Sequence, residues 1–164
     1  MMDLHMYSLE DVYLSAIKAE IESKELYDGI AARVRNAFLK EKMEFLAAEE
    51  GKHRAAIERM HAKDFPGKKL ALPSRSPVPL PHVEKPEGRK LSEVFEMAMK
   101  AEQAASEFYS AFANLFPNDQ PKKLALQYFA AMETGHYKLI EIERDNALKF
   151  EDYDDYWPMM HSGP

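Results

Sequence analysis

The stretch AAMETGHYKLIEIE, residues 130–143, places Glu133 and His136 three positions apart in a segment with helical periodicity. In a helix, both side chains would lie on the apolar face that Phe129 and Ile140 also form. A buried carboxylate without a partner costs several kcal/mol of stability. Either this face is in contact with water, or a positive group beside it neutralises the charge.

The same pattern occurs again in the first half of the chain. The stretch FLAAEEGKHRAAIE, residues 45–58, aligns with YFAAMETGHYKLIE, residues 128–141, and its Glu50-x-x-His53 repeats the opening motif. A single Glu-x-x-His is a weak signal in a chain this rich in glutamate. Its recurrence in an aligned repeat is a much stronger one.

The segments that precede these two motifs repeat as well. AIKAEIESKELYDGIA, residues 16–31, aligns with AMKAEQAASEFYSAFA, residues 98–113, and this alignment pairs Glu20 with Glu102. Each half of the chain therefore predicts a hairpin of two helices. Two such hairpins form a four-helix bundle.

Four segments have helical periodicity, at about residues 8–35, 38–62, 92–116 and 121–149. Ser8 and Ser92 are the predicted N-caps of the first and third helices. Residues 63–90 hold six of the ten prolines, which exclude a helix there, whereas the other two connections are short. We predict an all-α domain, residues 1–150, in which a long proline-rich crossover joins the hairpins. An acidic, aromatic tail follows at residues 151–164.

The composition restricts the classes of function. A net charge of −6 argues against nucleic acid as the main partner. No apolar run reaches the roughly 18–20 residues that span a bilayer, and no signal peptide is recognisable, so we expect a cytoplasmic protein. The chain has no cysteine, which excludes disulfides, thiolate catalysis and iron–sulfur ligation. Histidine and carboxylate ligands remain, and they suit iron, manganese or zinc.

Each half supplies one glutamate from its first helix and a Glu-x-x-His pair from its second. Residues three apart share a helix face, so both members of a pair can reach one metal ion. This arrangement is the ligand set of a dinuclear metal centre inside a helical bundle. Four carboxylates also balance the charge of two divalent ions. The predicted metal ligands are Glu20, Glu50, His53, Glu102, Glu133 and His136.

Two competing patterns are weaker. Glu49 also lies near the first histidine of the repeat, but Met132 occupies its position in the second half. Glu58 and His61 have the spacing of the motif, but Arg144 stands where the second half would need a histidine. We interpret that pair as a coincidence on the protein surface.

Tyr27 and Tyr109 lie two turns beyond the lone glutamates and on the same helix faces. They either pack in the core or donate hydrogen bonds to a ligating carboxylate. The sequence favours neither reading. His5, His82 and His161 lie outside the predicted helices and have no counterpart in the repeat, so we expect them to be solvent-exposed.

The six predicted ligands and the two tyrosines together resemble the rubrerythrin branch of the ferritin-like superfamily, over about residues 8–150. The resemblance implies a ferritin-like four-helix bundle with a non-haem di-iron centre, often in a homodimer. By this resemblance, Glu50 and Glu133 would bridge the two irons. Glu20 and Glu102 would be the terminal carboxylates, and His53 and His136 would bind one iron each.

Two features depart from the family pattern. Typical rubrerythrins carry a rubredoxin domain with four cysteines, and this chain has none, so its electrons must come from a separate protein such as a rubredoxin. Typical rubrerythrins also have a glutamate three residues after the ligand of the third helix. Ala105 occupies that position here, with Ser23 at the matching position of the first half. This absence puts the redox-linked ligand exchange of the family in doubt.

The leading functional hypothesis is a redox enzyme that reduces peroxide or dioxygen at two iron ions. One alternative is a ferroxidase that stores or passes on iron, and another is a structural bundle stabilised by metal. Manganese or zinc would fit the same ligands. We also expect a homodimer, in which the long crossover permits helix exchange between subunits.

Overall fold

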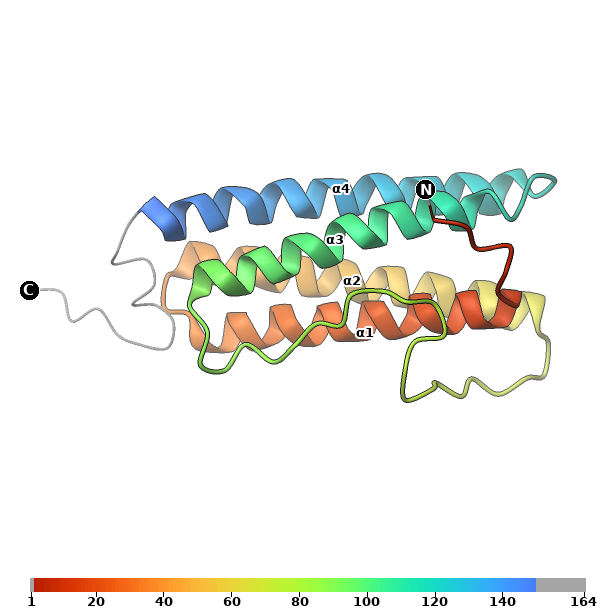
Figure 1. The fold of residues 1–164 in the computed structure, drawn as a ribbon, viewed down its shortest axis with the longest axis horizontal. Helices are drawn as coiled ribbons and strands as arrows, with labels where there is room; N and C mark the ends of the chain where they lie inside the picture. Colours follow the sequence, from red (N-terminus) through yellow and green to blue (C-terminus); the bar gives the residue numbers. More distant parts are fainter. Residues whose placement is uncertain (1, 150–164) are drawn as a thin grey trace, which may run out of the picture.

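The computed structural model describes residues 2–149, and within them the chain forms four helices that lie side by side as a bundle (Figure 1). The helices are α1 (Leu9–Arg33), α2 (Ala37–Asp64), α3 (Leu91–Ala113) and α4 (Gln120–Lys149). Helix α1 packs mainly on α2, and α3 mainly on α4. The predicted all-α fold of two joined hairpins is therefore confirmed. The tail at residues 151–164, with His161, lies outside the described residues.

The helices begin where polar side chains satisfy the first free N–H groups. The Ser8 hydroxyl accepts a hydrogen bond from the Asp11 N–H at 3.1 Å. At the start of α2, the side-chain Oδ1 of Asn36 accepts hydrogen bonds from the backbone N–H groups of Phe38 and Leu39. The prediction of Ser92 as a cap was wrong, because α3 begins one residue earlier and Lys90 is its N-cap. The Lys90 N–H donates to the Glu93 carboxylate at 3.1 Å, and Ser92 is buried inside the first turn.

Helix α3 also ends earlier than predicted, at Ala113. The next three residues turn tightly, because each of their N–H groups donates to the carbonyl three residues before it. The connection to α4 thus includes residues that the periodicity assigned to the helix. Among the described residues, no helix is long and apolar enough to cross a membrane.

The crossover between α2 and α3 has no regular secondary structure and runs back along the bundle (Figure 1). It is held to α1 at Val78, which is buried and whose N–H donates to the Ser15 hydroxyl at 3.1 Å. Its two glycines, Gly67 and Gly88, have φ values of +78° and +77°, which glycine adopts without strain. By returning the chain along the bundle, the crossover makes α3 antiparallel to α1.

The apolar core is divided into two clusters. One cluster, with Leu46 and Phe95, fills the end of the bundle where α3 begins. The other, with Ile17 and Phe112, fills the end where α3 finishes. Along every helix, the predicted metal ligands come between residues of the two clusters, so the polar groups form a layer in the middle of the core.

Candidate metal centre

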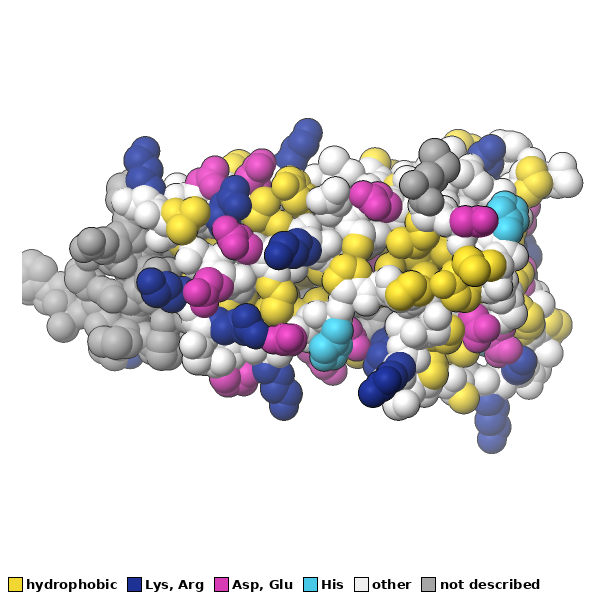
Figure 2. Space-filling view, in the orientation of Figure 1, with side chains coloured by type: hydrophobic (Ala, Val, Ile, Leu, Met, Phe, Trp, Pro, Cys, Tyr) yellow, Lys and Arg dark blue, Asp and Glu magenta, His cyan; other side chains and the backbone are white. Residues whose placement is uncertain are grey.

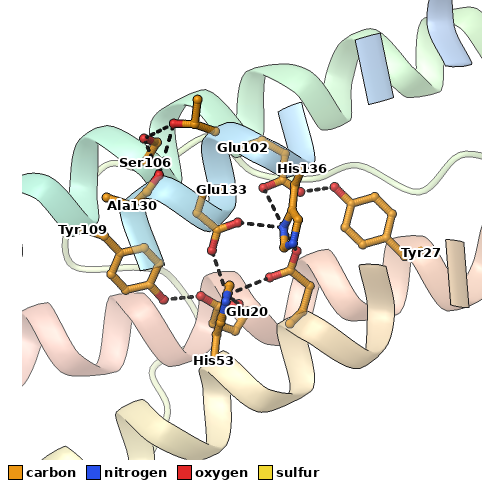
Figure 3. A network of polar contacts seen from close by, with 11 residues as sticks. Glu20, Tyr27, His53, Glu102, Ser106, Tyr109, Ala130, Glu133 and His136 are labelled. Atoms are coloured by element: carbon orange, nitrogen blue, oxygen red, sulfur yellow. Dashed lines mark hydrogen bonds and ion pairs between the residues drawn. The ribbon is translucent and has the colours of Figure 1, made fainter. Parts of the chain in front are cut away.

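All six predicted ligands lie buried in this central layer and come from the four helices; Figure 3 labels every one of them except Glu50. None of them exposes more than 3% of its surface. They form two overlapping groups, in each of which the candidate ligand atoms lie within 4.8 Å of one another. The first group is Glu20, Glu50, His53 and Glu133, and the second is Glu50, Glu102, Glu133 and His136.

The first group is arranged around Nδ1 of His53. This atom lies 2.9 Å from Oε1 of Glu133, 3.5 Å from Oε2 of Glu50 and 3.7 Å from Oε2 of Glu20. The histidine thus faces the lone glutamate of its own hairpin and the two glutamates that both groups share.

The second group repeats this geometry. Nδ1 of His136 lies 3.1 Å from Oε1 of Glu50, 3.1 Å from Oε2 of Glu133 and 3.7 Å from Oε2 of Glu102. The two imidazole rings are nearly parallel, with centroids 5.8 Å apart. The internal repeat of the sequence therefore appears as a local two-fold arrangement of the site.

Several atoms of the site are buried and have no hydrogen-bond partner. Although some of them are close together, their contacts lack hydrogen-bond geometry. The atoms are Oε2 of Glu20, Oε1 of Glu50, Oε1 of Glu133, both ring nitrogens of His53 and Nε2 of His136. Unpartnered buried polar groups are rare and costly, and a cluster of them that lies this close together could hold a metal ion. Carboxylate oxygens and imidazole nitrogens are a donor set that fits iron, manganese or zinc.

Without a metal, the two glutamates that belong to one group each have raised pKa values, whereas the two glutamates shared by both groups have lowered ones. Burial, together with the charge of Glu50, raises the pKa of both Glu20 and Glu102 well above the usual value. Burial also opposes ionisation of Glu50 and Glu133, but the neighbouring histidines outweigh it. The pKa of Glu50 falls to about 2, and that of Glu133 is also lowered.

The pKa values of the two histidines are raised by the same contacts that lower those of Glu50 and Glu133. Burial disfavours an imidazolium ion, but the three surrounding carboxyl groups outweigh burial and raise the pKa of His53 and of His136 to about 12. Two imidazolium ions then balance the two ionised glutamates. The metal-free centre is neutral in this state, and a metal ion must displace protons to bind there.

Tyr27 and Tyr109 each reach across from one hairpin to the other (Figure 3). The Tyr27 hydroxyl of α1 donates to Glu102 of α3, and the Tyr109 hydroxyl of α3 donates to Glu20 of α1. Both rings are also buried in the core, so packing and hydrogen bonding occur together. Burial and the nearby carboxylates raise the pKa of both tyrosines, which keeps the hydroxyls protonated as donors. Their influence on a bound metal stays a prediction.

The sequence interpretation of His61 was wrong in one respect. Glu58 does pair with Arg54 at 2.8 Å near the surface, but His61 is only 2% exposed. It packs edge-on against the Tyr13 ring, with centroids 5.8 Å apart, and its Nε2 lies 3.7 Å from a Glu10 oxygen. Its spacing from His53, two helical turns along α2, was the signal that it shares the inner face.

A buried acidic residue was also missed. Glu143 is 2% exposed and forms an ion pair with Lys42, which joins α4 to α2. Its position three residues after Ile140 was the signal that it lies on the inner face. His5 and His82 are exposed, as expected.

Comparisons with known proteins agree with this geometry. The sequence model of the family described as Rubrerythrin matches residues 11–142. The solved structure of a hypothetical protein from Pyrococcus furiosus is 34% identical in sequence, with a TM-score of 0.77. The alignment covers 89% of this chain and 94% of that one. No functionally curated protein matches this chain significantly.

Proposed function

Because this chain belongs to the rubrerythrin family, a ferritin-like di-iron family, we propose that its central layer holds two iron ions and reduces peroxide or dioxygen. The observation that carries the proposal is the set of unpartnered, buried oxygen and nitrogen atoms in two overlapping groups. A structural polar network would satisfy its own atoms, whereas a metal centre leaves its ligand atoms free for the ion.

The overlap of the two groups assigns the ligands. Glu50 and Glu133 belong to both groups and would bind both irons. Each remaining pair would bind one iron, with Nδ1 as the histidine ligand because that atom faces the carboxylates. The pairs are Glu20 with His53, and Glu102 with His136. Four carboxylates and two divalent ions make the reduced centre neutral.

Two ferrous ions held there would supply one electron each, and these two electrons, together with two protons, would convert one hydrogen peroxide into two water molecules. The chain itself contributes burial, which keeps bulk water from the centre. Tyr27 and Tyr109 contribute hydroxyl hydrogen bonds that fix the orientation of Glu102 and Glu20. The two protons are taken from solvent.

The proposal is tested by loading the metal-free protein with ferrous iron without oxygen and then adding hydrogen peroxide. We expect two irons per chain, one peroxide consumed for every two irons, and an absorption band of an oxo-bridged ferric pair. Glu133→Ala should lose this stoichiometry, whereas Glu44→Ala, at an exposed position, should keep it. Two bound irons that consume no peroxide would overturn the redox function.

The electrons must be replaced after each reaction. The chain has no cysteine with which to hold its own iron–sulfur centre, so we propose a separate electron-donor protein such as a rubredoxin, and a cytoplasmic location. We further propose a homodimer, with helix exchange through the crossover. Sedimentation equilibrium separates a dimer from the large closed shell that iron storage by a ferroxidase requires.

A further inference from the structure

A small cavity of about 30 Å³ lies between α1 and α3, directly beside the candidate metal centre. At its inner end it is lined by the carboxyl groups of Glu20, Glu50, Glu102 and Glu133. At its outer end it is lined by Leu80, Pro81 and Val83 of the crossover. This is the space open to the centre of a water-sized sphere, and it exceeds the roughly 10–15 Å³ that one water molecule needs by this measure.

The walls of the cavity include small side chains from both helices, beside the larger Glu22, Phe108 and Tyr109. Ala19 and Ser23 of α1 line the cavity, as do Ala101, Ala104 and Ala105 of α3. The sequence repeat pairs Ala19 with Ala101 and Ser23 with Ala105, so both halves supply small residues at matching positions. Small residues by themselves indicate only that two helices approach closely.

The inner end of the cavity is formed by ligands of the candidate metal centre. Three of the four glutamates there, Glu20, Glu50 and Glu133, each keep one buried oxygen without a hydrogen-bond partner. These oxygens are the ones assigned to the metal ions above, so the cavity ends at the metal centre itself, and its volume of about 30 Å³ admits only a small molecule. The cavity therefore connects the reacting centre with the surface beneath the crossover.

The crossover covers the outer end of the cavity. Val78 is fixed to Ser15 of α1, and the Leu80 N–H donates to the Val78 carbonyl at 2.8 Å. Farther on, Nδ1 of His82 lies 3.4 Å from a Glu22 oxygen. A groove between α1 and the crossover adjoins the cavity and shares Ala19, Glu22, Leu80 and Pro81 with it, on a face that is otherwise covered by side chains (Figure 2). The side chain of Leu80, half-buried over the cavity, thus sets the width of the entrance.

We propose that this cavity is the route by which the oxidant enters, and that its width admits hydrogen peroxide or dioxygen but excludes alkyl hydroperoxides. The proposal rests on the proposed function, since it concerns access to the same centre. Ala105 and Leu80 are the specificity-determining residues. The Ala105 side chain limits the width of the cavity, and the Leu80 side chain limits the width of its entrance.

The test compares how fast hydrogen peroxide and tert-butyl hydroperoxide oxidise the ferrous protein in a stopped-flow experiment. The wild type should discriminate against tert-butyl hydroperoxide by at least about tenfold, as pockets do for added methyl groups. Ala105→Leu should slow hydrogen peroxide by a similar factor with two irons still bound. Ala48→Leu, which adds the same group on an exposed position of α2, should not. Leu80→Ala should raise the rate with tert-butyl hydroperoxide toward the rate with hydrogen peroxide.

A second readout does not depend on iron. Crystals of the metal-free protein under krypton pressure should show a krypton atom in the cavity of the wild type and none in Ala105→Leu. Equal rates for the two oxidants in the wild type, or an unchanged rate in Ala105→Leu, would overturn the route. A wild type that binds two irons and ignores hydrogen peroxide would instead overturn the proposed function, and the krypton site would still decide whether the cavity admits a small molecule.

Discussion

The four glutamates of the centre are chemically identical, and their different pKa values come from their neighbours alone. Glu50 and Glu133 lie within about a hydrogen-bond length of an imidazole nitrogen, at 3.1 Å or less, and burial cannot keep them protonated. Glu20 and Glu102 lie farther from the histidines, at 3.7 Å, and burial raises their pKa. The metal-free protein thus stores protons on the groups that a metal would use as terminal ligands.

Metal binding should release these protons. Both histidines have a pKa of about 12 and are protonated at neutral pH, so at least two protons leave when metal binds. Glu20 and Glu102 add up to two more, for a total of up to four. Since protons compete with metal, the apparent affinity should rise with pH. Calorimetry of metal binding in buffers of different ionisation enthalpy measures the number, and a heat that does not depend on the buffer would contradict it.

Each tyrosine hydroxyl should contribute measurably to stability. Tyr27→Phe removes the donor to Glu102 and leaves a buried carboxyl oxygen without a partner, which costs about 1–3 kcal/mol. Tyr109→Phe should cost a similar amount, because it does the same to Glu20. Urea denaturation of the metal-free protein measures both. Tyr128→Phe, at a 60% exposed position, should stay within about 0.5 kcal/mol of the wild type, and a similar loss there would contradict the assignment.

At this scale the sequence predicts which residues gather, but not which of them make contact. The repeat identifies the six polar residues because they form three matched pairs. Each pair interrupts an apolar helix face at the same position in both halves of the chain. Tyr27, however, lies on the same helix as Glu20 and yet donates to Glu102 of the other hairpin. Antiparallel packing of α1 and α3 places them side by side, and no pattern within one helix contains that information. His61 was missed because its repeat partner is arginine, although its own periodicity was correct.

At the scale of the elements, the prolines predict which segment is not helical, whereas capping hydrogen bonds determine the residue at which a helix begins. The six prolines of the crossover exclude a helix, and none forms there. At the start of α3, Ser92 has the residue type of a cap, but Glu93 satisfies the Lys90 N–H and moves the boundary. Nothing in the pattern of residues 63–90 predicts the path of the crossover, because Val78 is fixed by a hydrogen bond to a distant serine.

The attachment of the crossover to α1 should depend on that hydrogen bond. Ser15 and Val78 are both buried, so Ser15→Ala leaves the Val78 N–H without a partner and should cost about 1–3 kcal/mol. Chemical denaturation measures the loss, and limited proteolysis should cut within residues 63–90 faster than in the wild type. Ser74→Ala, at an exposed position of the same segment, is the matched control. Equal stability of the two variants would show that the crossover is held by its apolar contacts alone.

At the scale of the whole molecule, the two hairpins pack on each other less than the helices within each hairpin do. The polar layer in the middle of the bundle takes ligands from all four helices, so a bound metal pair would connect the hairpins directly. The tyrosine hydrogen bonds already connect them without metal. The repeat explains this design, because each hairpin supplies half of the ligands and neither half holds a complete site.

Metal removal should therefore lower the melting temperature of the whole bundle. At a free metal concentration a hundred times the dissociation constant, binding to the folded state adds about 2.7 kcal/mol of stability. For a chain of this length that corresponds to a shift of about 5–10 °C. Scanning calorimetry with and without metal measures the shift within each protein, so that structural effects of a substitution cancel. Glu102→Ala should lose the shift because it removes a ligand of one metal, whereas Glu107→Ala, exposed on the same helix, should keep it. A full shift in Glu102→Ala would place the stabilising metal outside the central layer and would leave the unpartnered atoms of the two groups without an explanation.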